Sequence, residues 1–446
     1  MNKLRLLVLG LALLHGASRA ADTPGFTSPL DFETALQRAL LHDPTLRASM
    51  ADVGVSEQEV RRARSPFLPR LDLTSSNQRI ESFGTIPGLE SLILSGQNHA
   101  YYSSSSLNIT MNLFNGGADL AALRLAHEKW NDADLQVRIK RVAVARAILD
   151  GFHALRQAQF DMRMAELRAD AKTNMLKQVD SEASLGRRAA LALSEAQYEA
   201  DNSALEFALR KRAARAAWRD LAAMTGEDDT AVPAPVTLDT AQKPSYRTTL
   251  ARHGFDEVAR TTEADVYASR ITQARLEVER ARSHFLPKLD ILVTNSFAGL
   301  SQSGIGAAYR DQAHDKLVFG FTLSWNLFNG FDTDAEVKAA SMRVVAAEAR
   351  RDVALDAQRK QLATVTRPLA DALEDERIQR QKLALAQRKL DISRVKLELG
   401  KADATAHESS QLDLELQQLE LEKRTETIDY YQSTLLLVNP ETKVTP

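Results

Sequence analysis

Cysteine is absent from the 446-residue chain. Its absence excludes disulfide bonds, zinc sites built on thiolates and a cysteine nucleophile, and it predicts no lipid-anchored amino-terminal cysteine. Long hydrophobic runs are missing too: mean hydropathy is -0.29, and no apolar stretch approaches the roughly eighteen residues that a membrane-spanning helix needs. The composition therefore excludes a multi-span helical membrane protein but leaves a β-barrel open, because barrel strands are only half apolar.

An excess of charge of one sign is also lacking. The chain carries 57 Lys and Arg against 59 Asp and Glu, a formal net charge of -2, whereas a nucleic-acid-binding protein needs a basic surplus to neutralise phosphates. We therefore expect no nucleic-acid partner. With 44% hydrophobic residues, the chain can bury a large core, which excludes general disorder.

Sequence patterns of enzymes and cofactor sites are not found. The nine histidines are scattered, without the close spacing that is typical of paired metal ligands. The stretch 301–306, Ser-Gln-Ser-Gly-Ile-Gly, follows a predicted strand but is expected to open no helix, so it is predicted to be a loop rather than a phosphate-binding turn. We therefore expect no enzyme activity, no cofactor and no metal site.

The first twenty residues have the pattern of a secretory signal peptide. Lys3 and Arg5 form a positive segment, residues 6–14 form an apolar segment too short to span a bilayer, and residues 18–20 offer a cleavage site after Ala20. The protein is therefore expected to be exported. An exported chain without cysteine fits a bacterial envelope protein better than a small secreted scaffold that needs disulfides.

An internal duplication is the most informative feature of the sequence. Segment 62–72, Arg-Ala-Arg-Ser-Pro-Phe-Leu-Pro-Arg-Leu-Asp, recurs at 280–290 with nine identities in eleven positions. The segment Asn-Leu-Phe-Asn-Gly stands unchanged at 112–116 and 326–330, an offset of 214 residues. The order of the two motifs is kept, which indicates a tandem repeat rather than two unrelated domains.

The predicted domain boundaries follow from this repeat and from proline and glycine positions. They are a signal peptide at 1–20; a first repeat at 21–230 with a β-hairpin at about 69–115 and a helical hairpin at about 117–225; a linker at 231–248; a second repeat at 249–440 with a β-hairpin at about 287–329 and a helical hairpin at about 331–438; and a tail at 441–446.

Strict alternation of apolar and polar residues predicts strands before each Asn-Leu-Phe-Asn-Gly motif. Their polar positions are rich in Ser, Thr and Asn, and the predicted loops of the two hairpins cover roughly 75–100 and 295–315. Partner strands are predicted directly after each Phe-Leu-Pro sequence, because proline ends the preceding helix. The apolar row comprises Leu107, Ile109, Met111 and Leu113 in the first half and Leu317, Phe319, Phe321, Leu323, Trp325 and Leu327 in the second.

The remainder of each half predicts unusually long helices. Residues 117–186 contain no proline, and Leu123, Trp130, Val137 and Val144 recur every seven residues, which is the spacing of a coiled-coil seam. Gly186 and Gly400 are predicted to turn the two helical hairpins, because glycine adopts left-handed backbone without steric cost.

Two interpretations of the β-hairpins stay open at this point. They could form an ordinary sheet packed on helices, or the polar face could line water inside a barrel and the apolar face could meet lipid. Four strands cannot close a barrel alone, since transmembrane barrels need about eight or more strands and no free edge. A barrel would therefore require several copies of the chain.

Taken together, these paired motifs, long helices and Leu-Gly hairpin tips resemble the TolC family of outer-membrane efflux proteins. The resemblance covers nearly all of the chain after the signal peptide. It implies a mainly α fold with a β-barrel part: a homotrimer in which long coiled-coil helices form an α-barrel across the periplasm, and four strands per chain contribute to a 12-stranded barrel in outer-membrane lipid. It further implies an exit duct fed by an inner-membrane ABC exporter or proton-driven pump through a periplasmic adaptor protein.

The resemblance also assigns candidate sites. Leu185, Gly186 and Arg187, and their counterparts Leu399, Gly400 and Lys401, match the hairpin tips that dock the adaptor in the family. The family often places aspartates at the tunnel entrance, but here Ala406 and Ser409 stand at those positions. Asp403 is a nearby acid that could serve at the entrance, although a solvated surface role is the simpler hypothesis.

Two functional classes are consistent with the sequence. One is an outer-membrane exit duct of a tripartite efflux or type I secretion system. The other is a periplasmic adaptor or a surface adhesin built on coiled coils, but an adaptor is expected to have one helical hairpin, whereas this chain has two. The duplication therefore favours the duct, while the cargo, whether drug, metal, peptide or protein, stays open.

Overall fold

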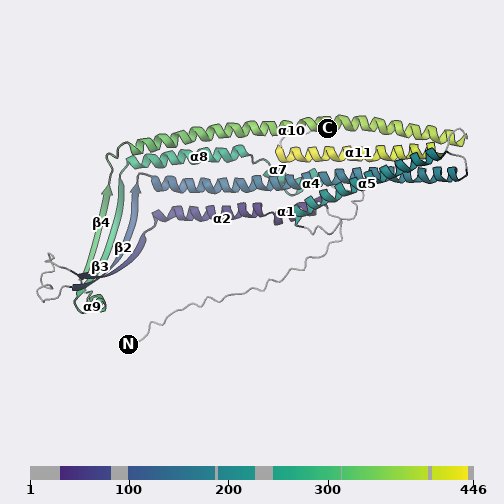
Figure 1. The fold of residues 1–446 in the computed structure, drawn as a ribbon. Helices are drawn as coiled ribbons and strands as arrows, with labels where there is room; N and C mark the ends of the chain where they lie inside the picture. Colours follow the sequence, from purple (N-terminus) through teal and green to yellow (C-terminus); the bar gives the residue numbers. More distant parts are fainter. Residues whose placement is uncertain are drawn as a thin grey trace.

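The computed structural model describes residues 31–81, 99–185, 189–226, 245–312, 314–399 and 404–439. Figure 1 shows an elongated molecule with a four-stranded sheet at one end and long, roughly parallel helices along the rest of its length. The predicted signal peptide and most of the predicted linker lie outside the described residues. The predicted mainly helical class with four strands per chain is confirmed.

Each half runs through a similar order of elements: helices, one turn of 3-10 helix, two strands, a very long helix and a return helix. In the second half a short additional helix lies between the two strands. The first half contains α1 (Phe32–His42), α2 (Pro44–Arg64), η1 (Ser65–Phe67), β1 (Arg70–Glu81), β2 (His99–Asn115), α4 (Ala118–Ser184) and α5 (Ala190–Thr225). The second half contains α6 (Tyr246–Arg252), α7 (Phe255–Val258), α8 (Glu263–Arg282), η2 (Ser283–Phe285), β3 (Lys288–Ser301), α9 (Ile305–Arg310), β4 (His314–Ser324), α10 (Asp332–Glu398) and α11 (Ala404–Val438).

The Phe-Leu-Pro sequences convert helix into strand as predicted. In the first half α2 ends at Arg64, η1 adds one tighter turn, and Leu68 adopts extended backbone with φ -111° and ψ 148°. Proline favours extended geometry in the residue before it, so the helix cannot continue through Pro69. The second half makes the same transition, with Leu286 at φ -101° and ψ 152°.

The longest helices, α4 and α10, contain 67 residues each and begin and end 214 positions apart. At about 1.5 Å per residue each is roughly 100 Å long. The predicted seven-residue seam of α4 is only partly buried: Val144 lies in the core, whereas Trp130 is exposed. Within the described residues, no helix combines the length and the apolar character needed to cross a membrane.

The four strands form one antiparallel sheet in the order β1-β2-β3-β4. They are longer than predicted, because β1 continues to Glu81 and β2 begins at His99, within the segment expected to be a loop. Serine-rich sequence has weak strand propensity, but here cross-strand pairing overrides it. Ser103 Oγ, for example, donates a hydrogen bond to Asn77 Oδ1 at 2.6 Å.

The main hydrophobic core lies midway along the helical part, where both halves of the chain meet. Short helices α1, α6 and α7 pack there against α4, α5 and α11. Its fully buried side chains include Leu36, Ile148, Leu149, Leu221, Leu250 and Phe255. A second cluster joins α10 to α11 through Val365, Leu369, Ile428 and Leu435.

Candidate functional site

One face of the sheet carries large apolar side chains in four successive cross-strand rows nearest the helices. Cα partners in an antiparallel sheet point to the same side, so the register defines each row. The rows are Leu289 with Leu323; Met111 with Ile291 and Phe321; Leu71 with Ile109, Val293 and Phe319; and Leu73 with Leu107 and Leu317, joined by Asn295. We call these rows the apolar face. Phe319, Phe321 and Leu323 are 62–68% exposed in the single chain.

The opposite face of the sheet is largely polar. Asp72, Asn108 and Thr294 share one row there, and Thr294 Oγ1 donates a hydrogen bond to Asn108 Oδ1 at 2.9 Å. The next row brings Ser106 beside Ser296 and Lys316. Leu292 and Val318 interrupt this polar face. The sheet thus separates apolar from polar side chains over most of its area.

Three residues predicted in the apolar row occupy different positions. β4 ends at Ser324, so Trp325 and Leu327 lie after the strand, in the connection to α10. The indole Nε1 of Trp325 donates to the carbonyl of Phe285 at 3.0 Å, which fixes this connection against η2. A bulge near the end of β2 lets Phe114, rather than Leu113, pair with Leu289. Alternation alone cannot locate where a strand ends or a bulge adds a residue.

The outer strands of the sheet have free edges. Among the described residues, β1 pairs only with β2 and β4 only with β3, which leaves edges 12 and 11 residues long. Backbone N–H and C=O groups along such an edge can pair with a further strand.

The helical part has two matching edges with apolar stripes. α5 packs against α4, whereas Leu191, Tyr198, Leu205 and Leu209 on its other side are 60–72% exposed. α10 packs against α8 and α11 but leaves an exposed stripe of its own. That stripe comprises Ile378, Leu385, Ile392 and Leu399, spaced seven residues apart. Each stripe has the spacing of a coiled-coil seam without its partner helix.

The two Asn-Leu-Phe-Asn-Gly motifs end in glycines with the same backbone and different surroundings. Gly116 and Gly330 both have φ +69°. A Cβ placed on Gly116 would overlap the carbonyl oxygen of Ser283 and lie 2.9 Å from Leu286 Cβ. At Gly330 a Cβ would meet no described atom within 4 Å. The position equivalent to Leu286 is Leu68, whose side chain is 64% exposed.

The helices α4 and α10 end at the end of the molecule farthest from the sheet (Figure 1), next to the predicted hairpin tips. Leu185 and Leu399 follow the last turns of α4 and α10, and both side chains are exposed. Gly186, Arg187, Gly400, Lys401 and Asp403 lie outside the described residues. Ala406 and Ser409 are exposed in the first turns of α11.

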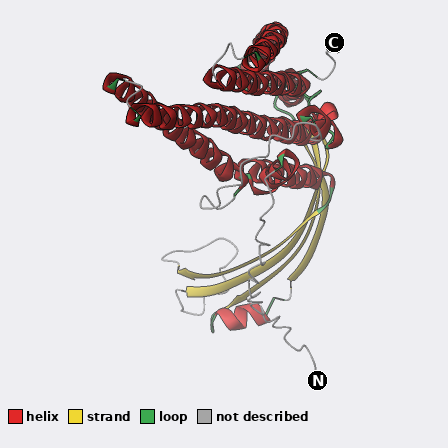
Figure 2. Ribbon diagram, turned by 90° about the vertical axis from the view of Figure 1, so that its right-hand side faces the viewer, coloured by secondary structure: helices red, strands yellow, loops and turns green. Residues whose placement is uncertain are grey.

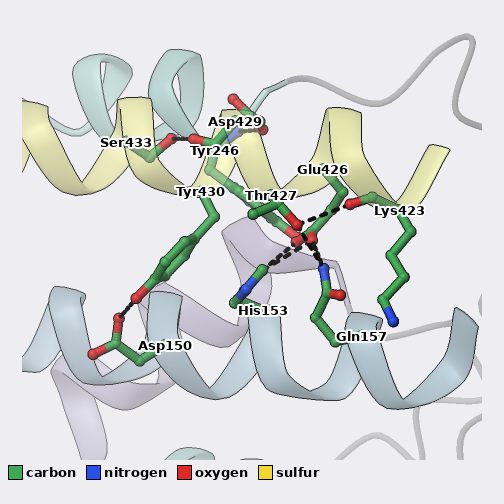
Figure 3. Close-up of polar contacts among 10 residues, drawn as sticks. All are labelled: Asp150, His153, Gln157, Tyr246, Lys423, Glu426, Thr427, Asp429, Tyr430 and Ser433. Carbon is green, nitrogen blue, oxygen red and sulfur yellow. Dashed lines mark hydrogen bonds and ion pairs between the residues drawn. The ribbon is translucent and has the colours of Figure 1, made fainter. Parts of the chain in front are cut away.

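A buried polar network connects the two halves midway along the helices (Figure 3). Glu426 of α11 lies at its centre. Its carboxylate lies 2.9 Å from His153 Nδ1 and accepts hydrogen bonds from Gln157 Nε2 at 2.7 Å and from the Tyr246 hydroxyl at 2.9 Å. The side chains come from α4, α6 and α11, and His153 and Glu426 are 273 positions apart. No sequence spacing could have predicted this pairing.

A second carboxylate of α11, Asp429, continues the network. It accepts hydrogen bonds from the Ser245 hydroxyl and from the backbone N–H of Tyr246, the latter at 3.0 Å. Burial is the main cause that raises the pKa of Asp429, and Glu426 raises it further, while the two hydrogen bonds act in the opposite direction. Burial also raises the pKa of Tyr246 well above its ordinary value. Protonation of this network is therefore coupled to how the two halves pack.

Within the described ranges, no group of three His, Asp or Glu side chains is placed to hold a metal ion. The features of the described residues that indicate a function are therefore the two sheet faces, the free edges of the outer strands and the exposed ends of α4 and α10.

Comparison with known proteins identifies the family. The model of the family described as outer membrane efflux protein matches residues 35–227 and 264–436, well over half of the chain. The chain belongs to the outer membrane efflux protein family. One matched segment lies in each half of the duplicated chain.

Individual relatives agree with this family membership. The chain is 24% identical over 407 residues to the pyoverdine export outer membrane protein OpmQ of Pseudomonas aeruginosa, covering 87% of this chain and 81% of that protein. It is 22% identical over 359 residues to outer membrane protein TolC of Escherichia coli K12, covering 78% of this chain and 68% of TolC. The structure of VceC from Vibrio cholerae has the same fold, with a TM-score of 0.69, 17% identity and 92% and 97% coverage of the two chains.

The family match decides between the two functional classes that the sequence left open. The resemblance carried by the paired motifs is confirmed, and with it the outer-membrane location and the role in efflux. The chain is therefore an outer-membrane efflux protein rather than a periplasmic adaptor or an adhesin.

Proposed function

We propose that this outer membrane efflux protein acts as a trimeric duct, with three copies joined in a ring that shares one 12-stranded barrel and one helical tunnel. The duct conducts cargo passively from the periplasm to the exterior and performs no chemistry. The polar face of the sheet lines the water-filled interior, and the apolar face meets lipid.

The sheet carries this proposal, because it combines an exposed apolar face with two free edges. In hydrocarbon every backbone polar group must be paired within protein, since water is not available. An open four-stranded sheet would leave β1 and β4 unpaired along more than ten residues each. Pairing β4 of one copy with β1 of the next removes both edges and satisfies these groups.

The exposed apolar stripes of α5 and α10 support the same arrangement of neighbouring copies in a ring. The stripe of α5 and the stripe of α10 lie on opposite sides of the chain's helical layer, so a ring of copies brings the α10 stripe of one against the α5 stripe of the next. Gly330 then takes Leu68 of a neighbouring copy as its counterpart to the internal contact between Gly116 and Leu286. A single chain would leave these apolar surfaces in water.

The exposed tips around Leu185 and Leu399 fit a protein partner. A periplasmic adaptor docked there would join the duct to an inner-membrane ABC exporter or proton-driven pump, and the pump would select the cargo. Because the relative OpmQ is a pyoverdine export protein, pyoverdine-like molecules are one cargo class to test. The family's entrance aspartates are replaced by Ala406 and Ser409 in this chain, and the nearby Asp403 is the candidate acid at the tunnel entrance.

Substitution on the two sheet faces tests the barrel. Phe321→Asp places a carboxylate on the proposed lipid face and should cost about 1 to 3 kcal/mol near the bilayer midplane, whereas Thr322→Asp on the adjacent polar face should be tolerated. The measurement is the amount of trimer recovered from the outer-membrane fraction in mild detergent. Equal losses for both variants, or a water-soluble periplasmic monomer for the unaltered protein, would overturn the proposal.

A further inference from the structure

Helix α9 lies against the far end of the sheet, on the same side as the apolar face. A Cβ on Gly299 of β3 would overlap the carbonyl oxygen of Ala308 in α9. After the helix, Gln312 Nε2 donates hydrogen bonds to Ser103 Oγ at 2.8 Å and to Ser105 Oγ at 3.3 Å. Ser103 and Ser105 alternate along β2 with the same phase as Leu107, so they belong to the same side of the sheet. Figure 2 shows the strands as an arc with the short helix against its convex side.

The prediction that residues 301–306 form a loop and open no helix is wrong, because α9 begins at Ile305. The polarity of this helix is inverted. Ala308 is fully buried against the strands, whereas the large side chains Ile305 and Tyr309 are 43% and 56% exposed. These two residues are four positions apart and so lie on one flank of the helix. A helix that packs on a protein in water normally does the reverse, burying its large apolar side chains.

The strands beneath α9 are polar where a lipid-facing surface should be apolar. The apolar rows end at Leu73, Leu107 and Leu317, and the following positions on the same side are mostly polar, among them Ser75, Asn77, Ser103 and Ser105, with Phe297 and Tyr101 as exceptions. Four rows extend only about 20 Å along the strands, less than the apolar band of roughly 25 Å typical of outer-membrane barrels. Ser103, although polar, is completely buried, because α9 and Gln312 cover it.

We propose that α9 is a membrane-contacting element that extends the apolar face into the outer leaflet. Ile305 and Tyr309 meet acyl chains at the boundary with the lipid headgroups, which is the depth that tyrosine side chains favour. The neighbouring Arg310 is exposed and reaches toward anionic headgroups. The inference rests on the proposed barrel, since it needs the apolar face to meet lipid.

Single-cysteine spin labelling tests the position of α9, because the chain contains no cysteine of its own. Ile305→Cys and Tyr309→Cys are made in the full chain, and the labelled trimer is reconstituted in phosphatidylethanolamine and phosphatidylglycerol vesicles. Collision with oxygen, which concentrates in hydrocarbon, is compared with collision with a water-soluble nickel chelate. Both labels should favour oxygen and resemble a label at Phe319→Cys on the apolar face.

Lys316→Cys is the matched water-exposed control, because Lys316 lies on the polar face near the same end of the sheet. If labels at 305 and 309 favour nickel as strongly as the label at 316, while the label at 319 favours oxygen, the assignment of α9 is overturned and the barrel stands. If the label at 319 also favours nickel, the proposed barrel itself fails.

Glycine substitutions test whether the packing of α9 on the strands sets the depth of the label at 305. Gly299→Leu should displace the helix from the strands and reduce the oxygen preference of the label at 305. Gly320→Leu is the control, since a Cβ at Gly320 meets no described atom within 4 Å and points to the other face. An unchanged oxygen preference in the Gly299→Leu background would show that seating of α9 on the strands does not set its depth, and would overturn the inference.

Discussion

The two halves of the chain carry the same Asn-Leu-Phe-Asn-Gly motif in two different situations. In the first half, Gly116 is pressed against Ser283 and Leu286 of the other half. In the second half, Gly330 has the same φ but a Cβ there would meet no atom of the described residues within 4 Å, and the residue equivalent to Leu286, Leu68, is exposed. Local sequence and local conformation are shared, so the difference comes from the tertiary surroundings of each motif in the single chain.

In the proposed ring, one junction between repeats is made inside the chain, and an equivalent junction is left for the next copy. The junctions also differ in chemistry. Inside the chain, α4 and α11 are joined by the buried network around Glu426, whereas the free edges present apolar stripes. Apolar surfaces can be exposed briefly before assembly without the cost of leaving buried charges unpaired.

The largest effect is expected when the internal junction is disturbed. Gly116→Ala introduces a side chain at positive φ and against the Ser283 carbonyl, which should lower the free energy of unfolding by roughly 2 to 5 kcal/mol. Gly330→Ala should cost the separated protomer only about 1 to 2 kcal/mol from backbone strain. Urea unfolding followed by circular dichroism measures both changes.

The same two variants are expected to differ in trimer assembly as well. Gly330→Ala is expected to reduce the ratio of trimer to monomer in mild detergent beyond what its protomer stability explains, because its new methyl group meets the neighbouring copy. A Gly330→Ala protein that assembles like the unaltered chain would contradict the proposed equivalence of the two junctions.

An intermediate effect is expected from the α10 stripe. Leu385→Asp changes an exposed side chain, so the separated protomer should keep its helix content, but burying the carboxylate against α5 of a neighbour should reduce trimer assembly by roughly 1 to 3 kcal/mol. Gln387→Asp adds the same charge two residues away on another flank of α10. If both variants assemble equally well, the stripe is not an interface.

The smallest effect concerns the internal network and its response to pH. Asp429 has a raised pKa in the folded protein, so its contribution to stability is full below the ordinary pKa of about 4 and is lost as pH rises through the folded pKa. Asp429→Asn removes the titrating carboxyl, keeps one oxygen that can accept from the Tyr246 N–H, and has an amide N–H that can donate to the Ser245 hydroxyl. It should therefore reduce the gain in stability on acidification from neutral pH, measured by urea unfolding.

The free edge provides the control for this pH effect. Stability changes caused by Leu385→Asp should appear in trimer assembly rather than in the pH dependence of protomer unfolding. An Asp429→Asn protein with the same pH dependence as the unaltered chain would show that burial of this carboxylate is not linked to folding.

Strand lengths and α9 show where sequence patterns are insufficient. Alternation predicted the apolar rows around Phe319 and Phe321, because side chains on a strand repeat every two residues. It extended β4 too far, to Leu327, and missed the strand character of residues 76–81 and 99–105. Those polar stretches become strand only because partner strands supply their hydrogen bonds. The sequence predicts a loop at 301–306, yet α9 begins at Ile305, and Gly299 lets this helix approach the sheet closely.

The sequence by itself determined the duplication, the positions where helices give way to strands, the long helices and the separation of polar from apolar faces. These are local or periodic properties, set by proline, by glycine and by the repeat of hydrophobic side chains. Only the tertiary structure decided which junction is filled within the chain, that His153 meets Glu426, and that α9 covers the serines of β2. Such contacts join residues up to 273 positions apart, and no sequence period specifies which distant surfaces meet.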